Sequence, residues 1–200
     1  MPFMVPDAEK ISALTTTLRS LSAPRMDWHS QLQFPIHDHI EAHEHLSWQT
    51  NPELDADHCH AVVLEGDTAI LLVARCLAPD WQRFCLTEAL GNAYLIDGFC
   101  RFAPGVPLVE PAEARVHRRQ NAHFATSLLA PPTLVDEVME CCEGHEDPTP
   151  RIAEAFGIPT AIAEQRRLAV SAFRSSADIS FGRAARCHAQ HQRHLTAVSA

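Results

Sequence analysis

The stretch Phe84–Leu95, which reads FCLTEALGNAYL, decides how the rest of this chain is interpreted. Pro79-Asp80 ahead of it suits the first turn of a helix, and Asp97-Gly98 behind it suits a helix end. At 3.6 residues per turn, Glu88 and Asn92 project from the same side of such a helix. The sequence therefore predicts one long helix between the two pairs, with two polar side chains on one face.

Apolar spacing predicts further elements on both sides of this stretch. Two β-rich runs, residues 60–64 and 69–73, flank Gly66-Asp67 and predict a hairpin. Between residues 23 and 57 no periodicity is visible. Helices are expected at residues 7–22, 113–129, 133–142, 151–156, 161–172 and 179–194. The pattern is typical of an α+β protein that is mainly helical, with a small antiparallel sheet.

Charge is distributed unevenly along the chain. The 200 residues carry a formal net charge of −9. Residues 1–150 hold 9 Lys and Arg against 22 Asp and Glu, a net of −13, whereas residues 151–200 hold 7 against 3, a net of +4. An acidic body repels a phosphate backbone, so nucleic-acid binding is not expected except through residues 151–200.

The seven Cys residues and the absence of a signal-peptide pattern at the N-terminus favour reduced thiols in a cytoplasm. No segment is long and apolar enough to cross a membrane, so no membrane partner is expected. GxSxG, GxGxxG and P-loop motifs are absent as well. The sequence therefore gives no motif for serine hydrolysis or nucleotide binding.

Three segments, in this order, carry a family resemblance. Residues 64–72 with 82–86 are similar to the hairpin and the RFTLA lead of the ImmA/IrrE family of zinc metallopeptidases. Residues 124–131, FATSLLAP, resemble that family's FAxxLLxP, and residues 152–168 resemble its LAxxFGVS…RL segment. Active members, associated with mobile genetic elements and stress responses, act against helix-turn-helix repressors. The resemblance implies a zincin-like two-helix core.

The resemblance fails at the residues that the family uses for chemistry. In its HELGH motif two His bind zinc and the Glu activates the bound water. Here Glu88, Ala89 and Asn92 stand in those places, and Arg118 stands where the resemblance implies a further Glu ligand. This set implies a degenerate site with no zinc or other cofactor. We predict instead an ion pair between Glu88 and Arg118 that bridges the two helices.

Thirteen His residues offer other metal-ligand patterns. His39 and His43 would share one face of a helix, and they are the alternative zinc ligands, although Glu41 between them would point away. His58 and His60 would lie on the same side of a strand. The His58-Cys59-His60 run, like Cys187, His188, His191 and His194 near the end of the chain, could bind a metal adventitiously, but we interpret both as ordinary polar surface.

These patterns lead to three expected units: an N-terminal helix (1–22), a degenerate metallopeptidase-like domain (23–143) and a C-terminal helical extension (151–200). The function expected is that of a pseudo-peptidase, inactive as an enzyme, which binds a protein partner such as a helix-turn-helix repressor of a phage or mobile element. The alternatives are a divergent zinc metallopeptidase with recruited His ligands and a DNA-binding regulator acting through residues 151–200.

Overall fold

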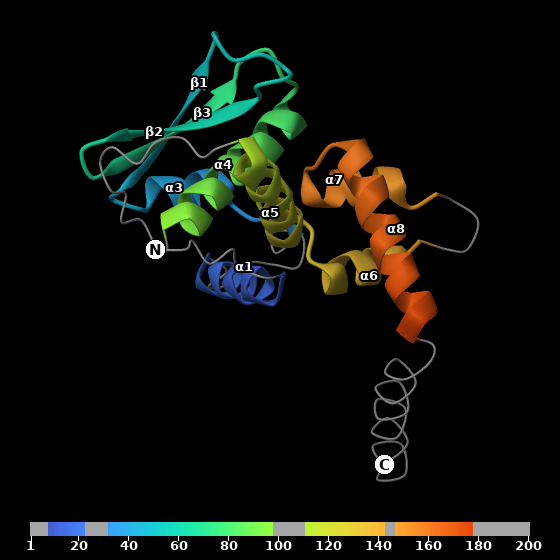
Figure 1. Cartoon of the computed structure of the whole chain (residues 1–200). Helices are drawn as coiled ribbons and strands as arrows, with labels where there is room; N and C mark the ends of the chain where they lie inside the picture. Colours follow the sequence, from blue (N-terminus) through green and yellow to red (C-terminus); the bar gives the residue numbers. More distant parts are fainter. Residues whose placement is uncertain (1–7, 23–31, 98–110, 143–146, 178–200) are drawn as a thin grey trace, which may run out of the picture.

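The computed structural model describes residues 8–22, 32–97, 111–142 and 147–177. Its fold is α+β and mainly helical, as predicted, with one small sheet lying over a helical body (Figure 1). None of the helices in these residues combines the length and the apolar character that a membrane crossing requires.

The sheet has three strands in the order β1-β3-β2. β2 (His60–Glu65) and β3 (Thr68–Ala74) form the predicted antiparallel hairpin, and Gly66 in its turn has φ 60°, a conformation that glycine adopts without steric cost. β1 (Leu46–Asn51) pairs in parallel with β3. The sheet is therefore mixed, and the prediction of a purely antiparallel sheet was wrong in this respect.

Two short elements lie in the stretch where the sequence shows no periodicity. α3 (Ile36–Glu41) has six residues, and β1 follows it closely. α3 buries Ile36 and Ile40 completely, but a helix of under two turns is too short to display a repeating apolar pattern. These elements close the apolar core beneath the sheet.

The centre of the molecule is the contact between α4 (Pro79–Asp97) and α5 (Pro111–Leu129). Gly91 of α4 lies where a Cβ atom would come within 2.7 Å of the Phe124 ring of α5. A side chain at position 91 would therefore hold the two helices further apart. α4 also packs on β2 and β3, so one helix has a face toward α5 and a face toward the sheet.

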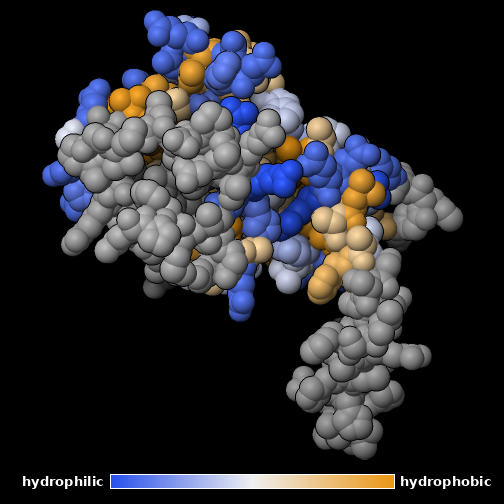
Figure 2. Space-filling view, viewed as in Figure 1, coloured by the Kyte–Doolittle hydropathy of each residue, from blue (hydrophilic) through white to orange (hydrophobic). Residues whose placement is uncertain are grey.

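The remaining helices surround this centre. α1 (Ala8–Ser22) packs on α5, and α7 (Thr149–Phe156) packs on α8 (Thr160–Ala177) and on α6 (Pro132–Glu140). The helices predicted up to residue 172 are confirmed, and the one predicted at 179–194 lies outside the described residues. Figure 2 shows apolar colour on the outer side of α8, where Leu168 and Phe173 are exposed.

Candidate functional site

Four potential metal ligands gather where the start of β2 meets α4. They are Cys59, His60, Cys85 and Glu88, and one ligand atom of each lies within 4.8 Å of all the others. Cys59 Sγ is 3.5 Å from His60 Nδ1, and the same nitrogen is 3.7 Å from Glu88 Oε2. Within the described parts of the chain, this is the one group of three or more such side chains.

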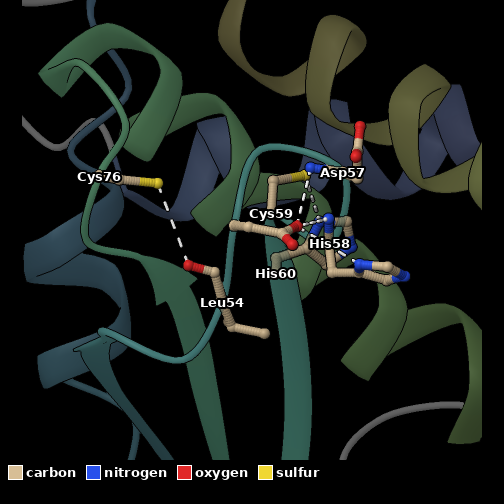
Figure 3. A network of polar contacts seen from close by, with 7 residues as sticks. Leu54, Asp57, His58, Cys59, His60 and Cys76 are labelled. Atoms are coloured by element: carbon tan, nitrogen blue, oxygen red, sulfur yellow. Dashed lines mark hydrogen bonds and ion pairs between the residues drawn. The ribbon is translucent and has the colours of Figure 1, made fainter.

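Two local features of the backbone bring these side chains together. Cys85 and Glu88 are three residues apart on α4, so they lie on the same face of the helix. Cys59 ends the loop before β2, and His60 is the first residue of the strand, paired with Val73 (Figure 3). Because Cys59 precedes the strand, the alternation of side chains along β2 does not apply to it, and Cys59 and His60 can lie on the same side.

The site is largely sheltered from water. Cys85 is buried, Cys59 is half-buried, and the side chains of His60 and Glu88 are only 18% and 15% exposed. Burial raises the pKa of the Glu88 carboxyl to about 7, a shift that His60 opposes and the Cys59 sulfur reinforces. The carboxyl therefore holds a proton far more readily than a carboxyl in water.

The two sulfurs affect each other's ionisation. A hydrogen bond from the Cys85 thiol is the main cause that lowers the pKa of Cys59, and a second hydrogen bond from His60 adds to it. The same sulfur contact, together with burial, raises the pKa of Cys85. Cys59 is therefore the thiol of the pair that ionises first.

Apart from Glu88, the positions matched to the family's active site lie outside this group. Asn92 Oδ1 accepts a hydrogen bond of 3.3 Å from Asn121 Nδ2 on α5, whereas Ala89 is completely buried in the core. Arg118 is exposed, and the ion pair of Glu88 is with His60. The predicted ion pair between Glu88 and Arg118 is therefore wrong: His60, which the sequence analysis assigned to the surface, occupies that place beside Glu88.

The zinc that the resemblance implies does not fit these matched positions. Glu88 pairs with His60 of β2 and Asn92 bonds to Asn121 of α5, so the two side chains have different partners although they project from the same side of α4, and an amide is in any case a weak ligand. Asn121 Oδ1 is buried without a hydrogen-bond partner, but it is again an amide oxygen. No step of zinc-assisted hydrolysis can be derived from this set.

The alternative His ligands are separated by the end of α3. His39 lies in the helix and its Nε2 is 3.1 Å from the Tyr94 hydroxyl, whereas His43 lies beyond the helix and its Nδ1 accepts a hydrogen bond from the His45 N–H. Burial is the main cause that lowers the pKa of His39. The structure gives His39 a place in a polar contact with Tyr94, and it does not bring a third ligand to the pair.

The loop before β2 separates the residues of the His58-Cys59-His60 run. His58 is exposed, lies 3.3 Å from Asp55 and does not belong to the metal-ligand group. Figure 3 shows this loop, together with Cys76, whose thiol points to the Leu54 carbonyl at 4.0 Å. Sequence reasoning missed Cys59 and Cys85, and the one available signal was the spacing of three between Cys85 and Glu88 on a helix.

Comparisons with known proteins give a distant likeness in fold. No family model matches the chain, and no curated protein matches it. The chain is similar to a solved structure described as a Mycobacterium tuberculosis transcriptional regulator, with a TM-score of 0.49 and 13% identity. The likeness covers 78% of this chain and 45% of that protein, so this chain spans less than half of its length. At this TM-score it carries no functional argument.

Proposed function

We propose that this chain is a catalytically inactive regulatory module on an ImmA/IrrE-like peptidase scaffold, and that it acts in the cytoplasm by binding a protein partner. The observation that carries the proposal is Ala89. It stands where the family has its general base, and its methyl group is completely buried. A methyl group cannot take a proton from water, so hydrolysis by the family's mechanism is lost while the scaffold remains.

An acidic surface beside the sheet supports binding as the mode of action. Exposed carboxylates gather at both ends of β2: three in the loop before the strand and two at the turn after it. They are Glu53, Asp55, Asp57, Glu65 and Asp67. β2 is an edge strand of the described sheet, so the surface along its outer edge is accessible to a partner. Such a surface attracts a basic partner and steers its approach.

The chemistry of this surface fits the DNA-reading face of a helix-turn-helix repressor. Those faces are basic because they bind phosphates. A negative surface that covers such a face competes with DNA for it. We therefore propose that the partner is a DNA-binding repressor of a phage or mobile element, and that regulation follows from occupancy and not from cleavage.

The direct experiment mixes the purified chain with helix-turn-helix repressors from its own genome, in buffers with and without added zinc. We expect a stoichiometric complex with one repressor that weakens as salt rises, and both chains should remain intact on a denaturing gel. Repressor cleavage that a chelator abolishes would instead establish the divergent metallopeptidase and overturn the proposal.

Two matched double variants distinguish the effect of the acidic surface on binding from the effect of the chain's total charge. Glu53→Gln with Glu65→Gln removes two exposed carboxylates beside β2, and Glu154→Gln with Glu164→Gln removes two exposed carboxylates on α7 and α8. The first pair should weaken the complex several-fold at low salt, since each surface charge contributes about 0.2–1 kcal/mol. Equal effects of the two pairs would contradict a role for this surface.

The DNA-binding alternative rests on the turn between α7 and α8. Gly157 has φ 59° and joins the two helices through a turn of three residues, as in a helix-turn-helix. However, Arg166 donates to the Ala130 carbonyl at 2.7 Å and Arg167 to Thr149 Oγ1 at 3.0 Å. Both guanidinium groups serve the fold. A gel shift by the chain alone would nevertheless favour this alternative.

A further inference from the structure

The group of four at the junction of β2 and α4 has the composition of a transition-metal site. Cys59 and Cys85 supply two sulfurs, His60 an imidazole nitrogen and Glu88 a carboxylate oxygen. Thiolate and imidazole together select zinc and similar borderline-soft ions over magnesium or calcium, which require oxygen ligands. The ligands come from two elements that are separate in the sequence, so they meet only in the folded chain.

The spacing of the group agrees with tetrahedral coordination. Zinc bonds of about 2.0–2.3 Å at a tetrahedral angle place neighbouring ligand atoms roughly 3.3–3.8 Å apart. The sulfur of Cys59 and the nitrogen of His60 are 3.5 Å apart, and this nitrogen is 3.7 Å from the Glu88 oxygen. Because every pair lies within 4.8 Å, the widest one has to close by at most about 1 Å to reach zinc geometry.

The partners of the acidic groups also fit a metal site. Glu88 lies beside two sulfurs, and His60 is the one basic side chain within ion-pair distance of Glu88 in the described residues. Buried carboxylates are ordinarily paired with an Arg or Lys, or they coordinate a metal. A divalent ion at the centre of the four ligands would give Glu88 and the two sulfurs a common cationic partner.

We propose that Cys59, His60, Cys85 and Glu88 form a zinc site that fastens the first residue of β2 to α4. Four protein ligands fill a tetrahedral zinc shell and leave no position for a substrate or a hydrolytic water. The site therefore has a structural or metal-sensing role. This inference goes beyond the proposed function and does not rest on it, because neither the acidic surface nor Ala89 belongs to the site.

The experiment uses the full chain, without an affinity tag, purified under reducing conditions and loaded with Zn²⁺ or Co²⁺. We expect one zinc per chain by mass spectrometry of the metal. With Co²⁺ we expect the visible bands of a tetrahedral ion and a charge-transfer band from thiolate to cobalt. Zinc should also raise the melting temperature, since it binds the folded chain and not the unfolded one.

Ligand variants and matched controls locate the ion. Cys59→Ser and His60→Gln each remove one ligand, and zinc affinity should fall more than about 100-fold, because even second-shell changes cost 10–100-fold. The controls are Cys76→Ser and His58→Gln, an exposed Cys and an exposed His outside the group, which should bind zinc as the parent does. Cys59 and His60 are half-buried, so these two variants should still fold. Cys85 is buried, so Cys85→Ser is expected to disrupt folding and is not used.

Three outcomes would overturn the proposal. The first is a reduced chain that binds no zinc or cobalt at micromolar concentration. The second is binding that survives both ligand variants, which would place the ion on other residues, including the His residues between 188 and 194. The third is a cobalt spectrum without the thiolate band. Loss of the metal in both ligand variants but in neither control would support the site, whatever the repressor experiment shows.

Discussion

The contacts that α4 makes with α5 and with the sheet differ in what they offer to chemistry. Ala89 and Asn92, at positions matched to a zinc peptidase, carry a buried methyl group and an amide that bonds to an amide of α5. Cys85 and Glu88 supply a thiol and a carboxylate, which meet a second thiol and an imidazole at the start of β2. The comparison teaches that a helix can lose the ligands of one site and still hold a ligand set with another element, because each contact is determined by its own partner.

The face toward α5 should contribute to stability mainly through apolar packing. Phe124 is completely buried, and its ring lies against Gly91 and near Tyr94. Phe124→Ala should lower the free energy of unfolding by about 3–5 kcal/mol, which urea denaturation measures. Phe173→Ala, at a side chain 71% exposed, is the control and should change it little. Equal losses from both variants would contradict the packing described here.

The face toward the sheet should instead make stability depend on pH. In the metal-free chain the pKa of Glu88 is raised from 4.5 to about 7, so the folded state keeps a proton that the unfolded state releases above pH 4.5. The contribution of Glu88 to stability is therefore greatest below pH 4.5 and is lost as pH rises to about 7, by an order of 3 kcal/mol. Denaturation in a chelator across this range measures the fall.

Glu88→Gln should remove that pH dependence, because the amide does not titrate. Asn92→Ala, about one turn further along α4, should leave it unchanged. If the parent and the Glu88→Gln variant show the same pH profile, then the carboxyl is not sheltered as the structure has it.

The amide contact between the helices should have a smaller effect. Asn92→Ala leaves Asn121 Nδ2 without its partner at a buried position. The expected cost is about 1–2 kcal/mol of unfolding free energy, since an orphaned donor loses its desolvation energy. A double-mutant cycle with Asn121→Ala measures the pair itself, and a coupling energy near zero would show that the contact is not formed.

Gly91→Ala should have the smallest effect of the four. The new methyl group would lie 2.7 Å from the Phe124 ring, and overpacking costs about 1–3 kcal/mol. Alanine also favours a helix by about 1 kcal/mol over glycine, so the net loss should be near 1 kcal/mol. Phe124→Leu in the same chain relieves the clash and should reduce the loss caused by Gly91→Ala. A variant more stable than the parent would contradict the close approach of the helices.

The sequence was sufficient for the parts of the fold that are local in the chain. The long helices show apolar spacing over several turns, and the hairpin has Gly66 at its turn, so both could be predicted. β1 could not, because its partner in the parallel pairing, β3, is distant in the sequence and its own alternation extends over only four residues, 46–49.

The candidate site could not be predicted from the sequence for a related reason. Its ligands sit on two elements, and the contact between them is tertiary. Cys59 and His60 are neighbours, and strand alternation would send neighbours to opposite faces; the strand, however, starts only at His60. For the same reason His58, which alternation would group with His60, is exposed and pairs with Asp55.

The most direct test of the account is a crystal structure of the zinc-loaded chain with anomalous data at the zinc edge. The account expects one full-occupancy peak bounded by Cys59, His60, Cys85 and Glu88, with Asn92 still bonded to Asn121 and no metal between α4 and α5. A peak between those two helices would contradict it and restore the peptidase centre, and a zinc-loaded crystal without a peak at the β2 junction would remove the site.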